Sequence, residues 1–230
     1  MADATFTGLL PKDARKFGVF SARPRRAGSL MQLTGDKLTC ERGGREVFRG
    51  VGFSLKNGEA LLVTGRNGAG KSSLLRMIAG LVRIAAGSLV LDGGEADAAI
   101  GEQAHYLGHL DALKPALTVA ENLQFWAEFL GPAPGDIAPA LAAVELAPLA
   151  DLPAAFLSAG QRRRLSIARL VAVPRAIWLL DEPTSALDAA SQTRLAELMR
   201  RHLSSGGMIV AAAHGAIGLE RARELKMGEP

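Results

Sequence analysis

Apolar and polar residues alternate with a period of two in the early part of the chain, from Met31 onward. Turn signals stand between these runs at Gly43-Gly44 and Asn57-Gly58. Alternation of this kind between turn residues is typical of short β-strands. The runs cover 33–39, 46–48 and 51–55, and a further short run over 88–91 precedes Asp92-Gly93-Gly94. We therefore predict a small antiparallel sheet, with 88–91 as an edge strand.

Three other apolar runs show no alternation and predict strands that are buried on both faces. They cover 60–63, 176–180 and 208–213. Continuous apolar runs of this length are typical of a parallel sheet that is covered by helices. A helical period follows the first of these runs and ends near Gly80, and further helices are predicted over 118–131, between 139 and 147, from 158 to about 170, and over 189–203.

Two of these helices begin with a capping box, at Thr118-Val119-Ala120-Glu121 and at Ser158-Ala159-Gly160-Gln161. The pattern predicts an α/β protein with a mainly helical insertion over about 110–170. Three aromatic residues of the first capped helix, Phe125, Trp126 and Phe129, are expected to pack in the core or an interface rather than to form a ligand site.

Composition and charge are those of a soluble globular protein, with 48% hydrophobic and 22% charged residues among 230. The net charge of +4 lies in residues 1–30, which carry six basic and two acidic side chains; the remainder carries 21 of each. We predict that 1–30 is a basic, flexible extension, with a contact to anionic lipid or a partner as the alternative. The neutral remainder argues against nucleic-acid binding, and no apolar run approaches the roughly 18 residues that span a bilayer. The single cysteine, Cys40, is expected to be a small buried hydrophobe.

A phosphate-binding loop is predicted between the first buried strand and the helix that follows it. This stretch fits G-x-x-x-x-G-K-[ST], in which glycines allow backbone N–H groups to surround a polyphosphate. Lys71 is expected to reach the β- and γ-phosphates, and Ser72 to bind Mg²⁺. The predicted nucleotide-binding residues of the loop are Gly65, Arg66, Asn67, Gly68, Ala69, Gly70, Lys71, Ser72 and Ser73.

The three buried strands end at Gly65, Asp181 and His214. Ligands of open α/β sheets bind at the carboxyl ends of strands, so we expect these residues to converge on one nucleotide. Asp181 is predicted to hold Mg²⁺ opposite Ser72. Glu182, which is adjacent but not bound to the metal, is predicted to accept a proton from the attacking water.

These residues together resemble the ABC ATPases. Leu157-Ser158-Ala159-Gly160-Gln161 is similar to their LSGGQ signature, with Ala159 in place of a glycine. The other motifs follow in the family's order: the Walker-A loop at 65–73, Asp181-Glu182-Pro183-Thr184, the D-loop Ser185-Ala186-Leu187-Asp188 and the switch histidine His214. The resemblance implies that 31–230 is a P-loop NTPase domain with a RecA-like core, an antiparallel β subdomain and a helical subdomain. It also implies a head-to-tail dimer, in which Ser158, Ala159, Gly160, Gln161 and Asp188 act on the nucleotide of the other subunit, while Lys71, Glu182 and His214 are catalytic.

Two departures from the ABC pattern stand out. His109 occupies the place, nine residues before Thr118, where a glutamine usually contacts the metal and the lytic water. An imidazole can accept a hydrogen bond from that water but is a poorer Mg²⁺ ligand than an amide oxygen; the alternative is a plain helix-start histidine. The aromatic residue that usually stacks on adenine is also missing, and the corresponding stretch reads Glu41-Arg42-Gly43-Gly44-Arg45.

A narrower resemblance links the chain to the ATP-binding subunits of haem exporters in cytochrome c maturation, the CcmA family. It is carried by 106–115, 121–126 and 40–45. This resemblance implies ATP and Mg²⁺ as cofactors, peripheral attachment to the cytoplasmic face of the inner membrane, and a CcmB-type permease and a CcmC-type haem-handling protein as partners. Haem contact is expected through these partners, because His105, His202 and Cys40 lack ligand spacing. The alternatives are another ABC importer or exporter, or a soluble ABC ATPase that acts on nucleic acid or ribosomes.

Overall fold

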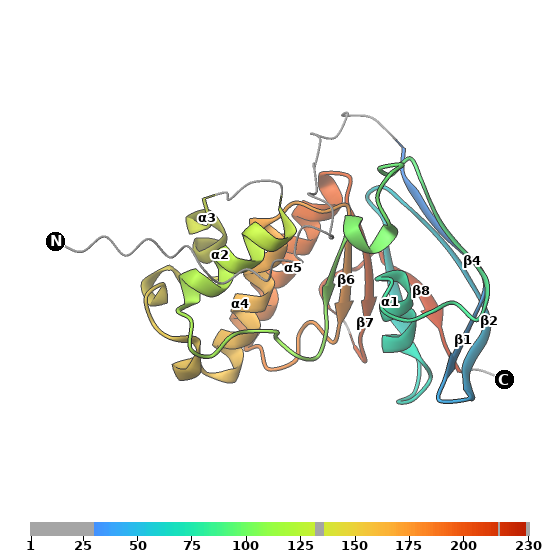
Figure 1. Cartoon of the computed structure of the whole chain (residues 1–230), viewed down its shortest axis with the longest axis horizontal. Coiled ribbons are helices and arrows are strands. Elements are labelled where there is room, and N and C mark those ends of the chain that lie inside the picture. Colours follow the sequence, from blue (N-terminus) through green and yellow to red (C-terminus); the bar gives the residue numbers. More distant parts are fainter. Residues whose placement is uncertain (1–29, 132–135, 216, 229–230) are drawn as a thin grey trace, which may run out of the picture.

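A three-stranded antiparallel sheet forms one side of the protein in the computed structural model, which describes residues 30–131, 136–215 and 217–228 (Figure 1). Its order is β2-β1-β4, with β1 at Gln32–Arg42, β2 at Arg45–Lys56 and β4 at Ala86–Asp92. The predicted edge strand is thus confirmed as β4. The predicted extension over 1–30 lies outside the described residues except for Leu30.

The two strands predicted at 46–48 and 51–55 are wrong as separate elements, because β2 runs through both. Its register against β1 shifts near this point, between Leu38 and Cys40. Gly50 has a φ of +69°, a conformation that glycine adopts without strain, so the strand passes an irregularity without ending. Cys40 in β1 is fully buried, as predicted, and burial raises the pKa of its thiol.

A five-stranded parallel sheet forms the centre of the molecule. Its order is β5-β6-β7-β3-β8, and every neighbouring pair is parallel. The strands are β5 (Ala104–Leu107), β6 (Ile177–Asp181), β7 (Met208–Ala212), β3 (Ala60–Thr64) and β8 (Arg223–Lys226). All residues of β6 and β7 are buried, which confirms the strands predicted from continuous apolar runs. The flanking strands β5 and β8 were not predicted.

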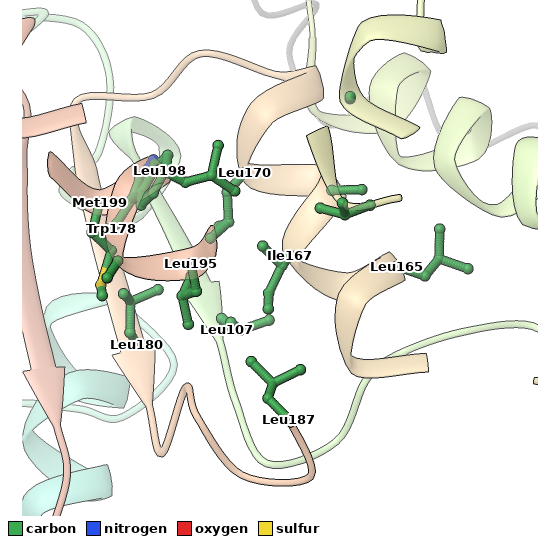
Figure 2. Close-up of a cluster of buried hydrophobic side chains, with 14 of the residues drawn as sticks. Leu107, Leu165, Ile167, Leu170, Trp178, Leu180, Leu187, Leu195, Leu198 and Met199 are labelled. Carbon is green, nitrogen blue, oxygen red and sulfur yellow. The ribbon is translucent and has the colours of Figure 1, made fainter. Parts of the chain in front are cut away.

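Helices cover both faces of this parallel sheet. Helix α1 (Lys71–Ile78) lies between the two sheets, and its Leu74 and Leu75 share a core cluster with Ile177 and Leu179 of β6. The alternate residues of β6 point to the opposite face. There they pack with α4 (Ala159–Ala172) and α5 (Ala189–Ser204), and Figure 2 shows this second cluster with Leu165, Ile167, Leu170, Trp178, Leu180, Leu195, Leu198 and Met199.

Two further helices, α2 (Val119–Leu130) and α3 (Ala138–Ala143), pack against α4 on the side away from the antiparallel sheet (Figure 1). The predicted helix between 139 and 147 is therefore too long. Glu145 has a φ of +54°, which is incompatible with a right-handed helix, and the chain continues as a 3₁₀ turn at Ala147–Leu149. Short 3₁₀ helices also occur at Ile100–Gln103 and Ala154–Phe156.

The aromatic residues of α2 are not core residues, which corrects the first of the two roles expected for them. The buried face of α2 consists of Val119, Asn122, Leu123 and Ala127. Phe129 is 62% exposed, and it stacks on Phe125 with ring centroids 6.1 Å apart. Lys114 lies over Phe125 and Arg169 over Trp126, at 4.0 and 4.5 Å from the ring centroids. In the described parts of the chain, no helix is both long and apolar enough to span a bilayer.

Candidate functional site

The carboxyl ends of four parallel strands meet at one edge of the central sheet. Gly65 follows β3, Asp181 ends β6, His214 lies two residues after β7 and His109 lies two residues after β5. Since these strands are neighbours in the order β5-β6-β7-β3, the four residues lie along one edge. Gly65, Asp181 and His214 follow or end adjacent parallel strands, as predicted. Their meeting on one nucleotide stays a prediction.

The glycines of the loop over 65–73 fit closely against neighbouring segments. Gly65 has a φ of +135°, and a Cβ added there would lie 2.3 Å from the Met227 carbonyl oxygen. Gly70, the N-cap of α1, has a φ of +96°, and its added Cβ would lie 2.7 Å from the Phe48 ring. Arg66, Asn67 and Gly68 are exposed. The absence of a side chain at Gly65 and Gly70 therefore lets the loop pack against Met227 and Phe48 without a steric clash.

Lys71 is buried at the start of α1 and folds back over the loop. Its Nζ donates to the carbonyl oxygens of Gly65 at 2.7 Å and Arg66 at 3.3 Å. An ammonium group with three donors, held beside the N-terminus of a helix, is suited to phosphate oxygens. The donors required for a polyphosphate are thus present in the loop.

The Asp181 carboxylate receives a hydrogen bond on each oxygen. The Ser72 hydroxyl donates to Oδ1 at 2.9 Å, and the Tyr106 hydroxyl donates to Oδ2 at 3.2 Å. Arg76 Nε in turn donates to the Tyr106 oxygen at 3.0 Å. Burial raises the pKa of Tyr106, whereas the hydrogen bond from Arg76 lowers it. Burial is the larger effect, so the pKa of Tyr106 is raised and its hydroxyl stays protonated at physiological pH. Tyr106 can therefore donate to Asp181 and fix the orientation of that carboxylate.

The pairing of Ser72 and Asp181 suits Mg²⁺. Mg²⁺ prefers oxygen ligands and is usually held by one or two protein groups together with substrate phosphates. In the described part of the chain, no group of three or more His, Cys, Asp or Glu side chains is arranged to hold a metal ion. A hydroxyl and a carboxylate beside a phosphate loop match the sparse protein ligation typical of a nucleotide-bound Mg²⁺.

Glu182 and His214 lie next to this pair. His214 Nε2 is 3.5 Å from Glu182 Oε1, and both side chains are partly exposed. The Glu182 backbone N–H donates to the Ala212 carbonyl oxygen at 2.9 Å, which fixes the residue against β7. Glu182 has a φ of +47°, an uncommon conformation for a residue with a side chain. Sparsely populated backbone conformations persist only where the surroundings enforce them, and they cluster at functional sites.

His109 is exposed, directly after the buried Gly108. Among the described residues, no hydrogen bond links His109 to Asp181 or Glu182. The preceding residue, Gly108, is held in place because its carbonyl oxygen accepts a 2.7 Å hydrogen bond from Arg163 Nη1. The structure therefore places His109 at the same edge of the sheet as Asp181 and Glu182, without a hydrogen bond to either among the described residues.

The signature segment lies on another helix. Ser158 caps α4 by accepting from the Gln161 N–H at 3.2 Å, and the Gln161 side chain accepts from the Ser158 N–H at 2.8 Å, which confirms the predicted capping box. Ser158 and Ala159 are exposed. Because α1 and α4 pack on opposite faces of the parallel sheet, this segment and the phosphate loop do not form one site within a single chain.

The remaining signature and D-loop residues lie close to one another. A Cβ added to Gly160 would lie 3.0 Å from the Ala186 carbonyl oxygen. Asp188 caps α5, accepting from the Ser191 N–H at 2.8 Å, and this hydrogen bond lowers the pKa of Asp188. The exposed start of α4 and the start of α5 thus lie side by side.

The hairpin at Gly43-Gly44 carries exposed arginines at positions 42 and 45 rather than an aromatic residue.

Two residues of the site were missed by sequence reasoning. Tyr106 lies in β5, a strand too short to show a period, yet it is the chain's single tyrosine and stands in an otherwise mostly apolar stretch. Arg163 is only 2% exposed, although it belongs to a run of three arginines that resembles a solvated face. A helical wheel would have revealed it, because Arg163 shares one side of α4 with the buried Ile167 and Leu170.

The fold and the ordered motifs define a protein of the ABC ATPase class. A family model described as "ABC transporter" matches residues 48–185. A solved structure described as an "ATP binding subunit of ABC transporter" has a TM-score of 0.76 at 24% sequence identity, over 85% of each chain, and so supports the fold alone.

Closer relatives narrow this class. The "Cytochrome c biogenesis ATP-binding export protein CcmA" of Rhodopseudomonas palustris (strain BisB5) is 61% identical over 198 residues, which are 86% of this chain and 98% of that protein. The protein of the same name from Bradyrhizobium diazoefficiens is 60% identical over the same shares. The chain belongs to the CcmA family of ABC ATP-binding proteins. It is accordingly an ATP-binding, ATP-hydrolysing transporter subunit, built as a P-loop NTPase with a parallel and an antiparallel sheet.

Proposed function

We propose that this chain powers haem export or delivery in the biogenesis of c-type cytochromes. The proposal is supported by identity of about 60% to relatives that are named as cytochrome c biogenesis export proteins. In this proposal the chain works as a pair of identical subunits on a CcmB-like permease with a CcmC-like haem-handling protein. It binds as a peripheral subunit at the cytoplasmic face of the inner membrane, and haem contacts the partners rather than this chain.

The observation that carries the catalytic part of the proposal is the 2.9 Å hydrogen bond from Ser72 to Asp181, beside the pair of Glu182 and His214. Ser72 and Asp181 would hold Mg²⁺, which neutralises charge on the phosphates when it is bound. Lys71 exchanges its hydrogen bonds to the carbonyls of Gly65 and Arg66 for bonds to phosphate oxygens. The backbone of 65–73 surrounds the rest of the polyphosphate.

Glu182 accepts the proton of the attacking water. The carboxylate that is paired with Ser72 at the proposed Mg²⁺ site belongs to Asp181, so the Glu182 carboxylate remains available as a base. His214, 3.5 Å from Glu182, orients that carboxylate and donates toward the terminal phosphate. We infer that His109, which lies two residues after β5 at the same edge of the sheet, accepts a hydrogen bond from the attacking water. Hydrolysis in this arrangement depends on positioning and on proton transfer, not on a covalent intermediate.

A second copy of the chain completes each site. Ser158 and Ala159 are exposed at the N-terminus of α4, where unpaired backbone N–H groups and the helix dipole favour an anion. The phosphate loop of the same chain lies across the parallel sheet. We infer that Ser158, Ala159, Gly160, Gln161 and Asp188 contact the nucleotide that the other subunit holds.

Substituting Glu182→Gln tests the catalytic assignment, because an amide cannot accept the proton at neutral pH. We expect nucleotide affinity within about threefold of wild type and turnover that falls by about 10²-fold or more. The variant should also form an ATP-dependent pair of subunits that is visible as a doubled mass. Turnover near the wild-type rate would refute the role of Glu182.

Recovery of the full chain from detergent-solubilised membranes tests the partners. We expect a complex that contains a small permease and a haem-handling protein, with ATPase activity that depends on Lys71. Recovery of ribosomes or DNA without a membrane protein would remove the transporter role and leave the ATPase chemistry intact.

A further inference from the structure

Arg163 is a charged side chain in the interior of the protein, and every nitrogen of its guanidinium group has an acceptor. Nη1 donates to the Gly108 carbonyl oxygen at 2.7 Å and lies 3.6 Å from Asp111 Oδ1. The other two nitrogens reach the segment after β6. Nη2 donates to the carbonyl oxygens of Asp181 at 3.1 Å and Glu182 at 2.8 Å, and Nε donates to that of Pro183 at 3.4 Å.

These acceptors belong to two segments that are distant in the sequence and adjacent in the site. Gly108 precedes His109 at the end of β5, and the three consecutive carbonyls belong to the end of β6 and the turn after it. Arg163 itself lies on α4, five residues after the cap at Ser158. One side chain thus connects the helix of the signature segment to both loops that present the acidic residues and His109.

Only an arginine can make this set of contacts. Its planar group carries five N–H donors in a fixed geometry, whereas lysine carries three on a single nitrogen. Burial lowers the pKa of Arg163, but the charge is compensated locally, since the carboxylates of Asp111, Asp181 and Glu182 all favour the charged guanidinium. Arg163 is 2% exposed, and each of its three guanidinium nitrogens has an acceptor. These contacts hold its side chain in one conformation.

We propose that Arg163 is a positioning residue for ATP hydrolysis, which fixes the backbone of Asp181 and Glu182 relative to Gly108 and couples all three to α4. It touches neither substrate nor metal. Its bond to the Glu182 carbonyl helps to hold the φ of +47° at that residue. The proposal rests on the proposed roles of Asp181 and Glu182. A displacement of α4, which begins at the predicted contact with the other subunit's nucleotide, therefore moves the catalytic carboxylate as well.

The test compares Arg163→Lys and Arg163→Gln with Arg164→Gln in the full chain, purified with its membrane partners. Arg164 is a matched control, because it is the next residue of α4 and also donates to a backbone carbonyl, that of Val144 at 3.0 Å. We expect both Arg163 variants to lower kcat tenfold or more with the KM for ATP within threefold, since small misplacement of catalytic groups costs rate rather than binding. Arg164→Gln should keep kcat within about twofold of wild type.

Retention of charge in Arg163→Lys without recovery of rate would show that geometry, and not charge alone, is needed. The proposal is overturned if both folded variants keep kcat within twofold, if KM rises in proportion to the loss of rate, or if both variants unfold at 20 °C, which would leave Arg163 a stability role only. Glu182→Gln, measured in parallel, separates the two proposals. If that variant turns over normally, the role of Glu182 fails; if it is inactive while the Arg163 variants are active, only the positioning role fails.

Discussion

His105 should make the protein less stable in mild acid, and His105→Gln should remove that contribution. His105 is 2% exposed in β5, and its Nε2 lies 2.7 Å from the Val173 carbonyl oxygen, so this nitrogen carries the proton in a neutral ring. Burial lowers the pKa of His105 to about 3, with Arg175 and Arg169 adding to the effect. In the unfolded chain the pKa returns to about 6.5.

The direction in which stability changes with pH follows from proton uptake by the unfolded chain. Between about pH 3 and pH 6.5 the unfolded chain binds the proton and the folded chain does not, so stability falls as the pH decreases through this window. At about pH 5 the contribution of His105 is a loss of about 2 kcal/mol relative to pH 7. The substituted glutamine can still donate an N–H to Val173 but does not titrate, and all other groups are common to both proteins.

Urea unfolding of the full chain, followed by tryptophan fluorescence at about pH 7 and pH 5, measures the effect. The free energy of unfolding should drop by about 2 kcal/mol more in the wild type than in His105→Gln between these conditions. Equal drops in the two proteins would refute the assignment. So would an NMR titration in which the His105 ring takes up a proton above about pH 5 in the folded state.

Three further substitutions test other parts of the structure. Gly70→Ala should lower the free energy of unfolding by about 3 kcal/mol, because the left-handed backbone is strained by a side chain and the new Cβ meets the Phe48 ring at 2.7 Å. Asn122→Ala should cost about 3 kcal/mol in urea unfolding, since this 2% exposed residue accepts from the Lys114 N–H and donates to three carbonyls in the segment just before α2. Ser72→Ala should raise the Mg²⁺ concentration for half-maximal ATPase about tenfold and change stability by less than about 1 kcal/mol.

Each of these has a matched control. Gly68→Ala places its Cβ in open space, so it should cost only the backbone strain and less than Gly70→Ala. Gln124→Ala removes only a surface hydrogen bond to Glu128 on the same helix and should cost less than about 0.5 kcal/mol. Ser72→Thr keeps the hydroxyl and should retain the Mg²⁺ dependence. If a control variant showed the same loss of stability or the same change in Mg²⁺ dependence as its test variant, the structural reasoning for that site would be wrong.

Short sequence patterns correctly predicted the helix starts and strands whose formation depends on residues close together in the chain. The helix starts at Thr118 and Ser158 are where the capping boxes placed them, because each cap is satisfied within four residues of chain. The buried strands β6 and β7 were recognised from apolar runs, since a strand covered on both faces needs apolar residues throughout. Asp181 and His214 then followed from their places at the ends of these strands.

The elements that were missed depend on neighbours distant in the sequence. Strand β8 is charged and mostly exposed, and it forms because β3 offers a free edge, so its own residues carry no strand pattern. The hydrogen bond from Tyr106 to Asp181 spans 75 residues, and the bonds of Arg163 span 18 to 55. Contacts of this kind are set by the register of the parallel sheet, which no short stretch of sequence encodes.

The strand order also constrains when the protein can fold during its synthesis. Strand β5 pairs only with β6 among the named strands, and β3 pairs only with β7 and β8. These partners begin at Ile177, long after the phosphate loop has left the ribosome. A nascent chain that ends before Ile177 therefore contains the nucleotide motif but exposes two apolar strands that have no sheet to join. The phosphate loop can therefore take its place at the edge of a complete sheet only after Met208–Ala212 has been made.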